Sequence, residues 1–325
     1  MTFKACTFED HDEAWCSTKV DGNRNTIGGH WGNCEKSCPT EMNTKRWMGK
    51  LRDNQLISEL SIPGTHDTMT GNKHRDNDCK DFFYQRCCVC QDMTLKEQLD
   101  AGIRFVDIRL KHHDNDFTLH HGFISLGVKF KTVLKILTDF LKANPTETVI
   151  MSYQKEHTEE DNKGVSFHAD FHKHIAKVNK DYIYSANSMP YLRDVRGKIV
   201  LLDWSYDGHM GLRRYNHLVE NWWDNVMYWS WFGWYVKEEY YTKLENNIAS
   251  SQSRAPRYFY SSWFSANDCK KTVLNYGPRN IAKYVNPEMH HRLEKRESGG
   301  NYGIIVMDFP SDYLIQTIIK ENNVP

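Results

Sequence analysis

Short apolar runs alternate with amphipathic stretches from about residue 46 to the C-terminus. Compact runs rich in β-branched and aromatic residues predict buried strands at 60–62, 104–110, 117–120, 148–152, 197–202 and 302–307. Apolar residues at helical spacing predict a helix over 128–143, which stops at Asn144-Pro145, and a last helix over 311–320. Strands that alternate with helices favour a parallel sheet with crossovers. Over about 280 residues, the leading α/β architecture is an irregular (β/α)8 TIM-type barrel.

The first 45 residues have a different character. They are polar, rich in glycine, asparagine and cysteine, and show no periodicity. Such a segment cannot bury a core of its own and needs cross-links. A chain of 325 residues has room for one large barrel and a small module. We therefore predict a cysteine-rich module over 1–45 and a barrel over 46–325.

Four of the nine cysteines lie within the first forty residues: Cys6, Cys16, Cys34 and Cys38. This density predicts disulfides and an oxidising compartment. The N-terminus has no basic start followed by an apolar run, so it is not a signal peptide. We reconcile the two observations by expecting the mature or partial form of a secreted, extracellular protein.

A second cysteine group follows the first predicted strand of the barrel. It comprises Cys79, Cys87, Cys88 and Cys90, within a polar insertion. A local disulfide is the default expectation for this group. A metal site of the pattern Cys-Cys-x-Cys is the alternative.

Charge and hydropathy exclude some partners. Lysine plus arginine balances aspartate plus glutamate at 42 each, so no bulk attraction to nucleic acid is expected. No run of about 20 apolar residues occurs, so no spanning helix is predicted. The segment 222–241 is unusually aromatic. Its aromatic side chains either pack in the core and loops, or form a rim that enters a lipid interface.

Polar residues gather at the ends of the predicted strands. In a barrel, these carboxyl ends lie on the one face that carries active sites. The residues at these ends are His66, Asp67, Arg109, His120, His121, Glu156, Asp203 and Asp308. Because polar residues recur at the carboxyl ends of so many predicted strands, we predict that they form a single site.

The residue types of this set suit phosphodiester chemistry. One histidine can remove a proton from an attacking hydroxyl while a second protonates the leaving oxygen. A buried aspartate behind the first histidine would fix its tautomer and favour its charged form. An arginine offers a fixed charge and forked donors to phosphate oxygens. No metal is needed in such a scheme.

Four motifs carry a resemblance to a known family. In order, SIPGTHDTM, RFVDIRL, TLHHG and NPTETVIMSYQKE resemble the X region of bacterial-type phosphatidylinositol-specific phospholipases C. Weaker resemblance continues through RGKIVLLD and GIIVMDFP. The resemblance implies a barrel enzyme that acts on a phospholipid at a membrane interface.

The resemblance also assigns roles to matching residues. His66 resembles the general base, and Asp308 matches the aspartate that orients it. Asp67 and Arg109 match the pair that binds and polarises the phosphate. His121 matches the general acid. Because Arg109 stands where calcium-dependent relatives place an acidic metal ligand, neither a metal nor another cofactor is expected. The implied products are diacylglycerol and a 1,2-cyclic inositol phosphate.

The basic residues that hold inositol in the family are missing at two places. Gln154 replaces a lysine, and Asp203-Trp204 replaces a lysine–arginine pair. These departures leave open a different head group or a glycosylated inositol lipid. The candidate substrate-binding residues are Glu156, which can accept a hydroxyl hydrogen bond, Asp203, and Tyr235, which can stack on a sugar ring.

Part of the N-terminal segment resembles the second half of a fibronectin type II module. The matching features are Cys6, Trp15-Cys16, and Trp31-Gly32 before Cys34. The resemblance implies a Cys6–Cys34 pair, leaves Cys16 to another cysteine such as Cys38, and suggests a matrix-protein or glycan partner. A generic disulfide-stapled extension is the alternative, and irregular spacings disfavour a zinc site.

Two other functions compete with the phospholipase. A lipid- or glycan-binding protein could keep the fold without turnover, although every catalytic position holds a competent residue. A metal-dependent phosphodiesterase would need several convergent carboxylates as metal ligands. Arg109 lies among the only carboxylates that could serve, and its positive charge disfavours a cation there.

Overall fold

The computed structural model describes most of the chain in separate stretches. They are residues 15–17, 31–33, 42–71, 88–156, 165–204, 210–221, 227–230, 233–236, 238–253, 258–265, 277–296 and 301–324. The chain divides into two compact units, residues 1–43 and 44–325. Among the described residues, no helix is both long enough and apolar enough to span a bilayer.

In the N-terminal unit, two short strands form an antiparallel pair. Strand β1 (Trp15–Ser17) pairs with β2 (Trp31–Asn33), and Cys16 lies opposite Gly32. The side chains of the four N-terminal cysteines lie outside the described residues, so their cross-linking stays a prediction.

The second unit begins two residues earlier than the sequence predicts. Thr44 and Lys45 belong to the 3-10 helix η1 (Thr44–Lys50) of this unit. The Lys45 ammonium lies 2.8 Å from Asp100, and the Lys45 carbonyl accepts a hydrogen bond from Arg104. These bonds attach the segment to the barrel rather than to the module.

Eight parallel strands form the frame of the barrel. They are β3 (Ile62–Thr65), β4 (Phe105–His113), β7 (Val149–Lys155), β9 (Ile199–Asp203), β10 (Leu212–Arg213), β11 (Leu218–Asn221), β14 (Phe259–Phe264) and β15 (Ile304–Met307). Their order across the sheet is β10-β9-β7-β4-β3-β15-β14-β11. Consecutive strands of this set are therefore neighbours except β10 and β11, and the last strand, β15, pairs with the first, β3. This succession is that of a TIM-type barrel, which confirms the predicted fold class. Within the described residues no strand ladder joins β10 to β11, so the barrel is open there.

The first barrel strand lies later in the sequence than predicted. It starts at Ile62, whose N–H donates to the Gly303 carbonyl, and it runs through Pro63-Gly64, beyond the predicted end at residue 62. Gly64 is required by close packing, because a Cβ there would lie 2.8 Å from Cβ of Phe105 on β4. The proline and glycine therefore belong to the strand.

An antiparallel hairpin extends β4 beyond the barrel. Strand β5 (Asp116–His121) pairs with β4, and β6 (Ile124–Lys129) pairs with β5. The β4–β5 turn places Asp114 at φ 49° and Asn115 at φ 59°, the left-handed pair that a two-residue hairpin loop of type I′ requires. Because β6 occupies 124–129, the helix predicted from residue 128 begins only at Phe130.

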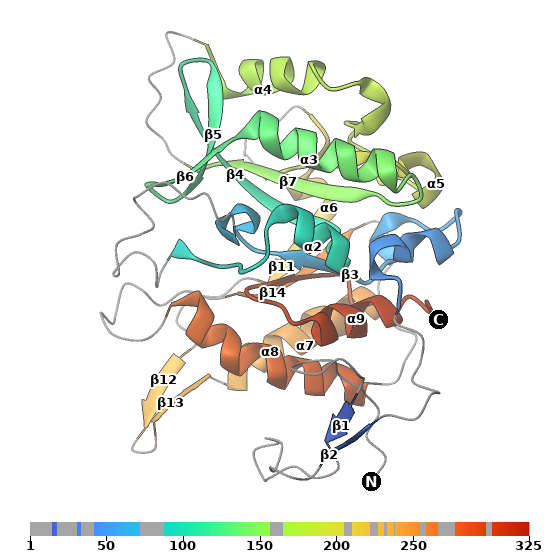
Figure 1. The fold of residues 1–325 in the computed structure, drawn as a ribbon, viewed down its shortest axis with the longest axis vertical. Coiled ribbons are helices and arrows are strands. Elements are labelled where there is room, and N and C mark those ends of the chain that lie inside the picture. The colour runs from blue at the N-terminus through green and yellow to red at the C-terminus, as the bar shows by residue number, and fades with distance from the viewer. Residues whose placement is uncertain are drawn as a thin grey trace. The chain divides into compact units, whose positions relative to one another are not determined.

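Helices and short helical turns surround the sheet. The helices are α2 (Leu95–Ala101), α3 (Phe130–Ala143), α4 (Phe167–Ala176), α5 (Leu192–Val195), α6 (Arg214–His217), α7 (Glu238–Ser253), α8 (Pro278–Lys295) and α9 (Asp312–Lys320), with 3-10 turns η2 (Ile57–Glu59), η3 (Thr68–Gly71) and η5 (Lys180–Tyr182). The C-terminal helices α8 and α9 pack against each other (Figure 1). Strand β8 (Ile183–Tyr184) adds to the edge of β9.

Burial follows the pattern of a parallel barrel. Strands β3, β9, β14 and β15 are buried at every position, as expected where helices cover one face and the barrel interior fills the other. Helix α3 buries its apolar stripe, which includes Phe130, Val133 and Leu137, and ends before Asn144 as predicted. The strands are thus held rigidly, and their carboxyl ends can position side chains precisely.

Candidate active site

The carboxyl ends of the strands bring most of the predicted residues together. His66 and Asp67 follow β3, Arg109 lies in β4, and Asp308 follows β15. His121 ends the hairpin strand β5, and Glu156 follows β7 directly. Direct contacts link these six side chains into one cluster.

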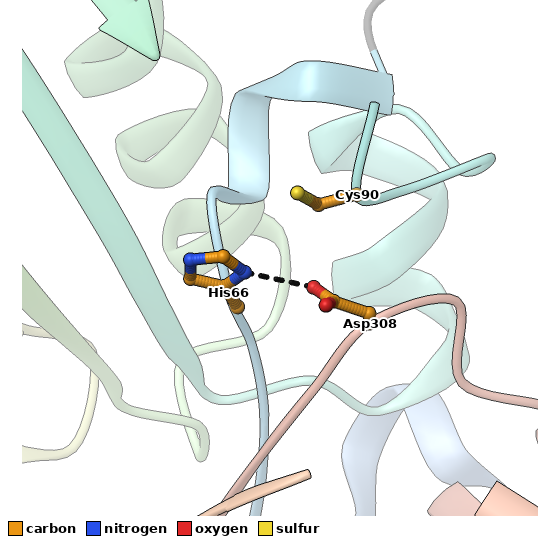
Figure 2. Close-up of side chains that lie close together, drawn as sticks. All are labelled: His66, Cys90 and Asp308. Atoms are coloured by element: carbon orange, nitrogen blue, oxygen red, sulfur yellow. Dashed lines mark hydrogen bonds and ion pairs between the residues drawn. The ribbon is translucent and has the colours of Figure 1, made fainter. Parts of the chain in front are cut away.

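Asp308 fixes the ring of His66. The His66 Nδ1 atom lies 2.8 Å from Oδ1 of Asp308, and both side chains are almost completely buried (Figure 2). A carboxylate accepts, so Nδ1 carries the hydrogen and Nε2 is directed to the rest of the cluster. Asn286 of α8 donates to the carbonyls of Asp308 and Phe309 and so holds the aspartate's loop in place.

Asp67 is the centre of the cluster. Its Oδ2 atom lies 3.2 Å from Nε2 of His66 and 3.2 Å from Nε2 of His121. Its Oδ1 atom lies 3.0 Å from Nε of Arg109. The backbone of Asp67 adopts φ 41°, a left-handed conformation that turns the chain sharply after His66. One carboxylate therefore contacts both imidazoles and the guanidinium.

Arg109 is surrounded by acidic groups. Its Nε atom also lies 3.1 Å from Asp107 Oδ2, and its Nη1 atom lies 3.6 Å from Glu156 Oε1. Asp107 in turn accepts the backbone N–H of Asp67, which is the supporting role that the strand position suggests. The side chain is 18% exposed, so the guanidinium is anchored by carboxylates yet reachable from solvent.

The two arginines of the RFVDIRL motif have different environments. Arg104, at the amino end of β4, is fully buried and pairs with Glu147 at 2.7 Å. Arg109 lies five residues later, at the carboxyl end that carries the site. The position along the strand therefore separates a structural arginine from a functional candidate.

His121 is oriented by the backbone of a neighbouring segment. Its Nδ1 atom lies 3.0 Å from the Cys88 carbonyl, which can only accept, so this nitrogen carries a hydrogen. Its Nε2 atom consequently faces Asp67. The rings of His66 and His121 stand 6.3 Å apart at their centroids and nearly perpendicular. The adjacent His120 is buried and only 6% exposed.

Burial and the charges of the cluster shift the pKa values of several groups. Burial raises the pKa of Asp308 and of Glu156. Burial alone would lower the pKa of His66, but the carboxylates of Asp308 and Asp67 outweigh it and raise the pKa to about 8. Burial would raise the pKa of Asp67, but Arg109, His121 and His66 together lower it. The site therefore holds an ionised carboxylate between cationic groups.

Asp203 and Tyr235 were also predicted to bind substrate. Asp203 is the last residue of β9 and is buried. Burial and the Asp203 carboxylate raise the pKa of Tyr153 on β7, whose hydroxyl donates to the Met210 carbonyl. The backbone of Tyr235 lies in β13 (Gly233–Val236), which pairs with β12 (Met227–Ser230), but its side chain lies outside the described residues. Substrate binding by either residue stays a prediction.

Three neighbours of the site were missed by the sequence analysis. Gln91 donates to the carbonyls of His66 and Met307 and so links the ends of β3 and β15. The Trp263 ring lies 5.8 Å from the His66 ring, edge to face. Cys90 is buried beside the cluster, and it forms no disulfide among the described residues, which contradicts a local disulfide for this cysteine. Trp263 could have been predicted near the site only if β14 had been recognised as a strand. The sequence around Gln91 and Cys90 holds no local signal that places them there.

Known proteins share the sequence and the fold of this chain. The family described as "Phosphatidylinositol-specific phospholipase C, X domain" matches residues 60–204. The 1-phosphatidylinositol phosphodiesterase of Listeria monocytogenes is 32% identical over 308 residues, which cover 89% of each chain. The protein of the same name from Staphylococcus aureus strain Newman is 27% identical and covers 54% of this chain and 56% of its own length.

A solved structure agrees with the sequence comparison. The phosphatidylinositol-specific phospholipase C from Listeria monocytogenes superposes with a TM-score of 0.69 at 30% identity, covering 86% of this chain and 98% of its own. The strand order, the strand-end cluster and the near full-length sequence similarity agree, so this chain belongs to the phosphatidylinositol-specific phospholipase C X-domain family.

Proposed function

We propose that this protein is a phosphodiesterase that cleaves an inositol phospholipid, or a glycosylated relative, into diacylglycerol and a cyclic inositol phosphate. One observation carries the proposal: the Asp67 carboxylate contacts two imidazoles and a guanidinium at the mouth of the barrel. The names of the relatives from Listeria and Staphylococcus, both 1-phosphatidylinositol phosphodiesterases, support the same substrate class.

The two histidines divide the proton transfers between them. His66 Nε2 removes the proton from the inositol 2-hydroxyl, while Asp308 holds the Nδ1 hydrogen and stabilises the imidazolium that forms. The hydroxyl oxygen attacks phosphorus, and the bond from phosphorus to the glycerol oxygen breaks. His121 Nε2 donates its proton to that oxygen, so one proton is gained and one lost at each turnover. Because the nucleophile is a hydroxyl of the substrate itself, no second molecule has to be brought to the phosphorus.

Arg109 and Asp67 act on the phosphate in this scheme. The Nε atom of Arg109 holds Asp67 and Asp107, and the proposal places its terminal nitrogens on the phosphate oxygens. A fixed cation at that point stabilises the charge that develops during attack. Glu156, held by the Gly122 N–H at 2.6 Å, is proposed to accept a hydroxyl of the head group.

The head group and the lipid surface require further proposals. Gln154, Asp203 and Trp204 stand where basic residues are expected, which favours testing glycosylated inositol lipids beside phosphatidylinositol. At the end of the aromatic segment 222–241, Tyr240 and Tyr241 are buried, which fits core packing there. Trp231 and Phe232 lie outside the described residues, so core packing and a lipid-facing rim both stay predictions for them.

The N-terminal unit carries a separate proposal. The cysteine and tryptophan positions support a fibronectin type II-like module with a matrix-protein or glycan partner. The cysteine density supports an extracellular location for the whole protein.

Hydrolysis of defined vesicles tests the proposed function. We expect cleavage of phosphatidylinositol or a glycosylated inositol lipid but not of phosphatidylcholine, at a rate that a chelator does not change. Phosphorus NMR should show a cyclic phosphate as the first water-soluble product. Vesicle binding without turnover would instead support the inactive binding protein, and loss of turnover with chelator would support a metal-dependent enzyme.

The pKa of His66 predicts the pH dependence of turnover. The base must be neutral in the free enzyme, so the acidic limb of the kcat/KM profile should have its midpoint near pH 8. The groups that face this imidazole are Asp308, Asp67, Arg109, His121, the Cys90 thiol and Trp263. Asp308→Asn removes a carboxylate that raises the pKa, so its acidic limb should move to lower pH while the plateau falls.

Rate profiles of the wild type and Asp308→Asn, measured with chelator in the buffer, check this expectation. Asp181→Asn, at an exposed aspartate of η5, is the matched control and should leave the limb in place. An unchanged limb in Asp308→Asn would refute the assignment of His66 as the titrating base.

A further inference from the structure

A thiol lies close to the proposed catalytic groups. The sulfur of Cys90, a nitrogen of His66 and a carboxylate oxygen of Asp308 all lie within 4.8 Å of one another. Figure 2 shows the three side chains converging from the loop after β3, the segment before α2 and the end of β15. Asp67 and His121 form a second such group with the same sulfur. Cys90 therefore adjoins both proposed proton carriers.

The position of this sulfur is built into the fold. The Cys90 N–H donates to the Thr70 hydroxyl at 3.0 Å, and the Cys90 carbonyl accepts the N–H of Phe309 at 3.0 Å. These two bonds attach the cysteine to η3 and to the residue that follows Asp308. The thiol is thus held in place by backbone contacts on two sides.

The facing carboxylate has an unused acceptor. Asp308 is 1% exposed, and its Oδ2 atom has no hydrogen-bond partner among the described residues, although Oδ1 binds His66. A buried carboxylate oxygen without a partner is costly, and a cation could satisfy it. The Asp308 carboxylate belongs to the same three-residue group as the sulfur, so a carboxylate with an unsatisfied oxygen accompanies the thiol.

The donor set selects a class of cation. Thiolate sulfur, imidazole nitrogen and carboxylate oxygen are the three ligand types of zinc sites, whereas calcium and magnesium take oxygen ligands. We propose that Cys90, His66 and Asp308 form a binding site for a soft divalent cation such as zinc, and that occupancy inhibits the enzyme. Three protein ligands would leave one of the four usual zinc positions open.

Inhibition follows from which atoms the cation would use. A cation bound between His66 and Asp308 would replace the hydrogen that fixes the base, and the Cys90 thiol would lose its proton to become a ligand. Both protons would be released to solvent. His66 then cannot be oriented for proton removal. Binding does not depend on the proposed function, but the inhibitory effect rests on it.

Cadmium and zinc titrations of the full chain test the site. Cadmium should produce a cadmium–thiolate absorption band in the wild type, and zinc should inhibit inositol-lipid cleavage where magnesium and calcium do not. In Cys90→Ser we expect basal turnover to remain, a weaker band, and an inhibitory zinc concentration at least about tenfold higher. Cys90→Ala is the second variant, should the serine perturb folding.

A neighbouring cysteine provides the matched control. Cys88→Ser makes the same chemical change two residues away, at a position that belongs to none of the ligand groups among the described residues. It should keep the band and the zinc sensitivity of the wild type. Unchanged cadmium binding and zinc inhibition in both Cys90 variants would overturn the proposal. If neither the wild type nor any variant cleaves lipid, the proposed function fails. The cadmium band still shows whether Cys90 binds the cation, so the two failures can be told apart.

Discussion

Replacement of His66 by alanine is expected to lower turnover of an inositol phospholipid by about 10²- to 10⁴-fold, the usual contribution of a positioned general base. The ring is held by Asp308 at 2.8 Å and has its second nitrogen against Asp67, so no neighbouring group can take over the same position. Steady-state cleavage of vesicles, with circular dichroism to confirm the fold, measures the loss. His113→Ala, at a half-exposed histidine next to the hairpin turn, is the matched control and should keep wild-type turnover.

A change of substrate separates the base from the acid. A soluble inositol phosphate ester with a good leaving group, such as a nitrophenolate, needs no protonation as it departs. His121→Ala should therefore recover most of its activity on that substrate, because only the acid is lost. His66→Ala should stay defective on both substrates. If the ester rescued His66→Ala rather than His121→Ala, the two roles would be reversed.

Arg109→Lys is expected to lower kcat/KM by about 10²- to 10³-fold, the range seen when one charge-stabilising donor is removed. Lysine keeps the positive charge that Asp67, Asp107 and Glu156 surround, so the fold should survive. It cannot reproduce the planar fork whose Nε atom contacts two carboxylates and whose terminal nitrogens we propose to contact the phosphate. Vesicle cleavage and thermal unfolding, measured side by side, distinguish lost catalysis from lost stability.

Arg193→Lys, at an exposed arginine of α5, is the matched control for this substitution. It should leave both kcat/KM and the unfolding temperature unchanged. Wild-type kcat/KM in Arg109→Lys would show that the guanidinium only holds the carboxylates together and does not contact the phosphate.

Local sequence patterns predicted the frame of the site well. The run around Phe105, the buried strand before Glu156 and the helix ending at Asn144 all have regular apolar spacing, which periodicity can detect. Arg109 was selected from its place near the carboxyl end of a predicted strand, the end of a barrel strand that reaches the active face. These features depend on neighbours in sequence.

Other features depend on contacts between distant segments. Pro63-Gly64 looks like a strand end, but close packing on Phe105 keeps it in the sheet. Gln91 and Cys90 occupy a polar stretch without periodicity, and their place beside the site exists only once β15 and η3 meet them. No pattern within the segment could have predicted those partners.

The segment of residues 88–91 joins the two halves of the proposed reaction. The Cys88 carbonyl accepts the hydrogen on Nδ1 of His121. The Gln91 side chain donates to the carbonyl of His66 and to that of Met307, the last residue of the strand before Asp308. A shift of these four residues would therefore misalign donor and acceptor simultaneously. Correct placement of both histidines depends on this one short segment.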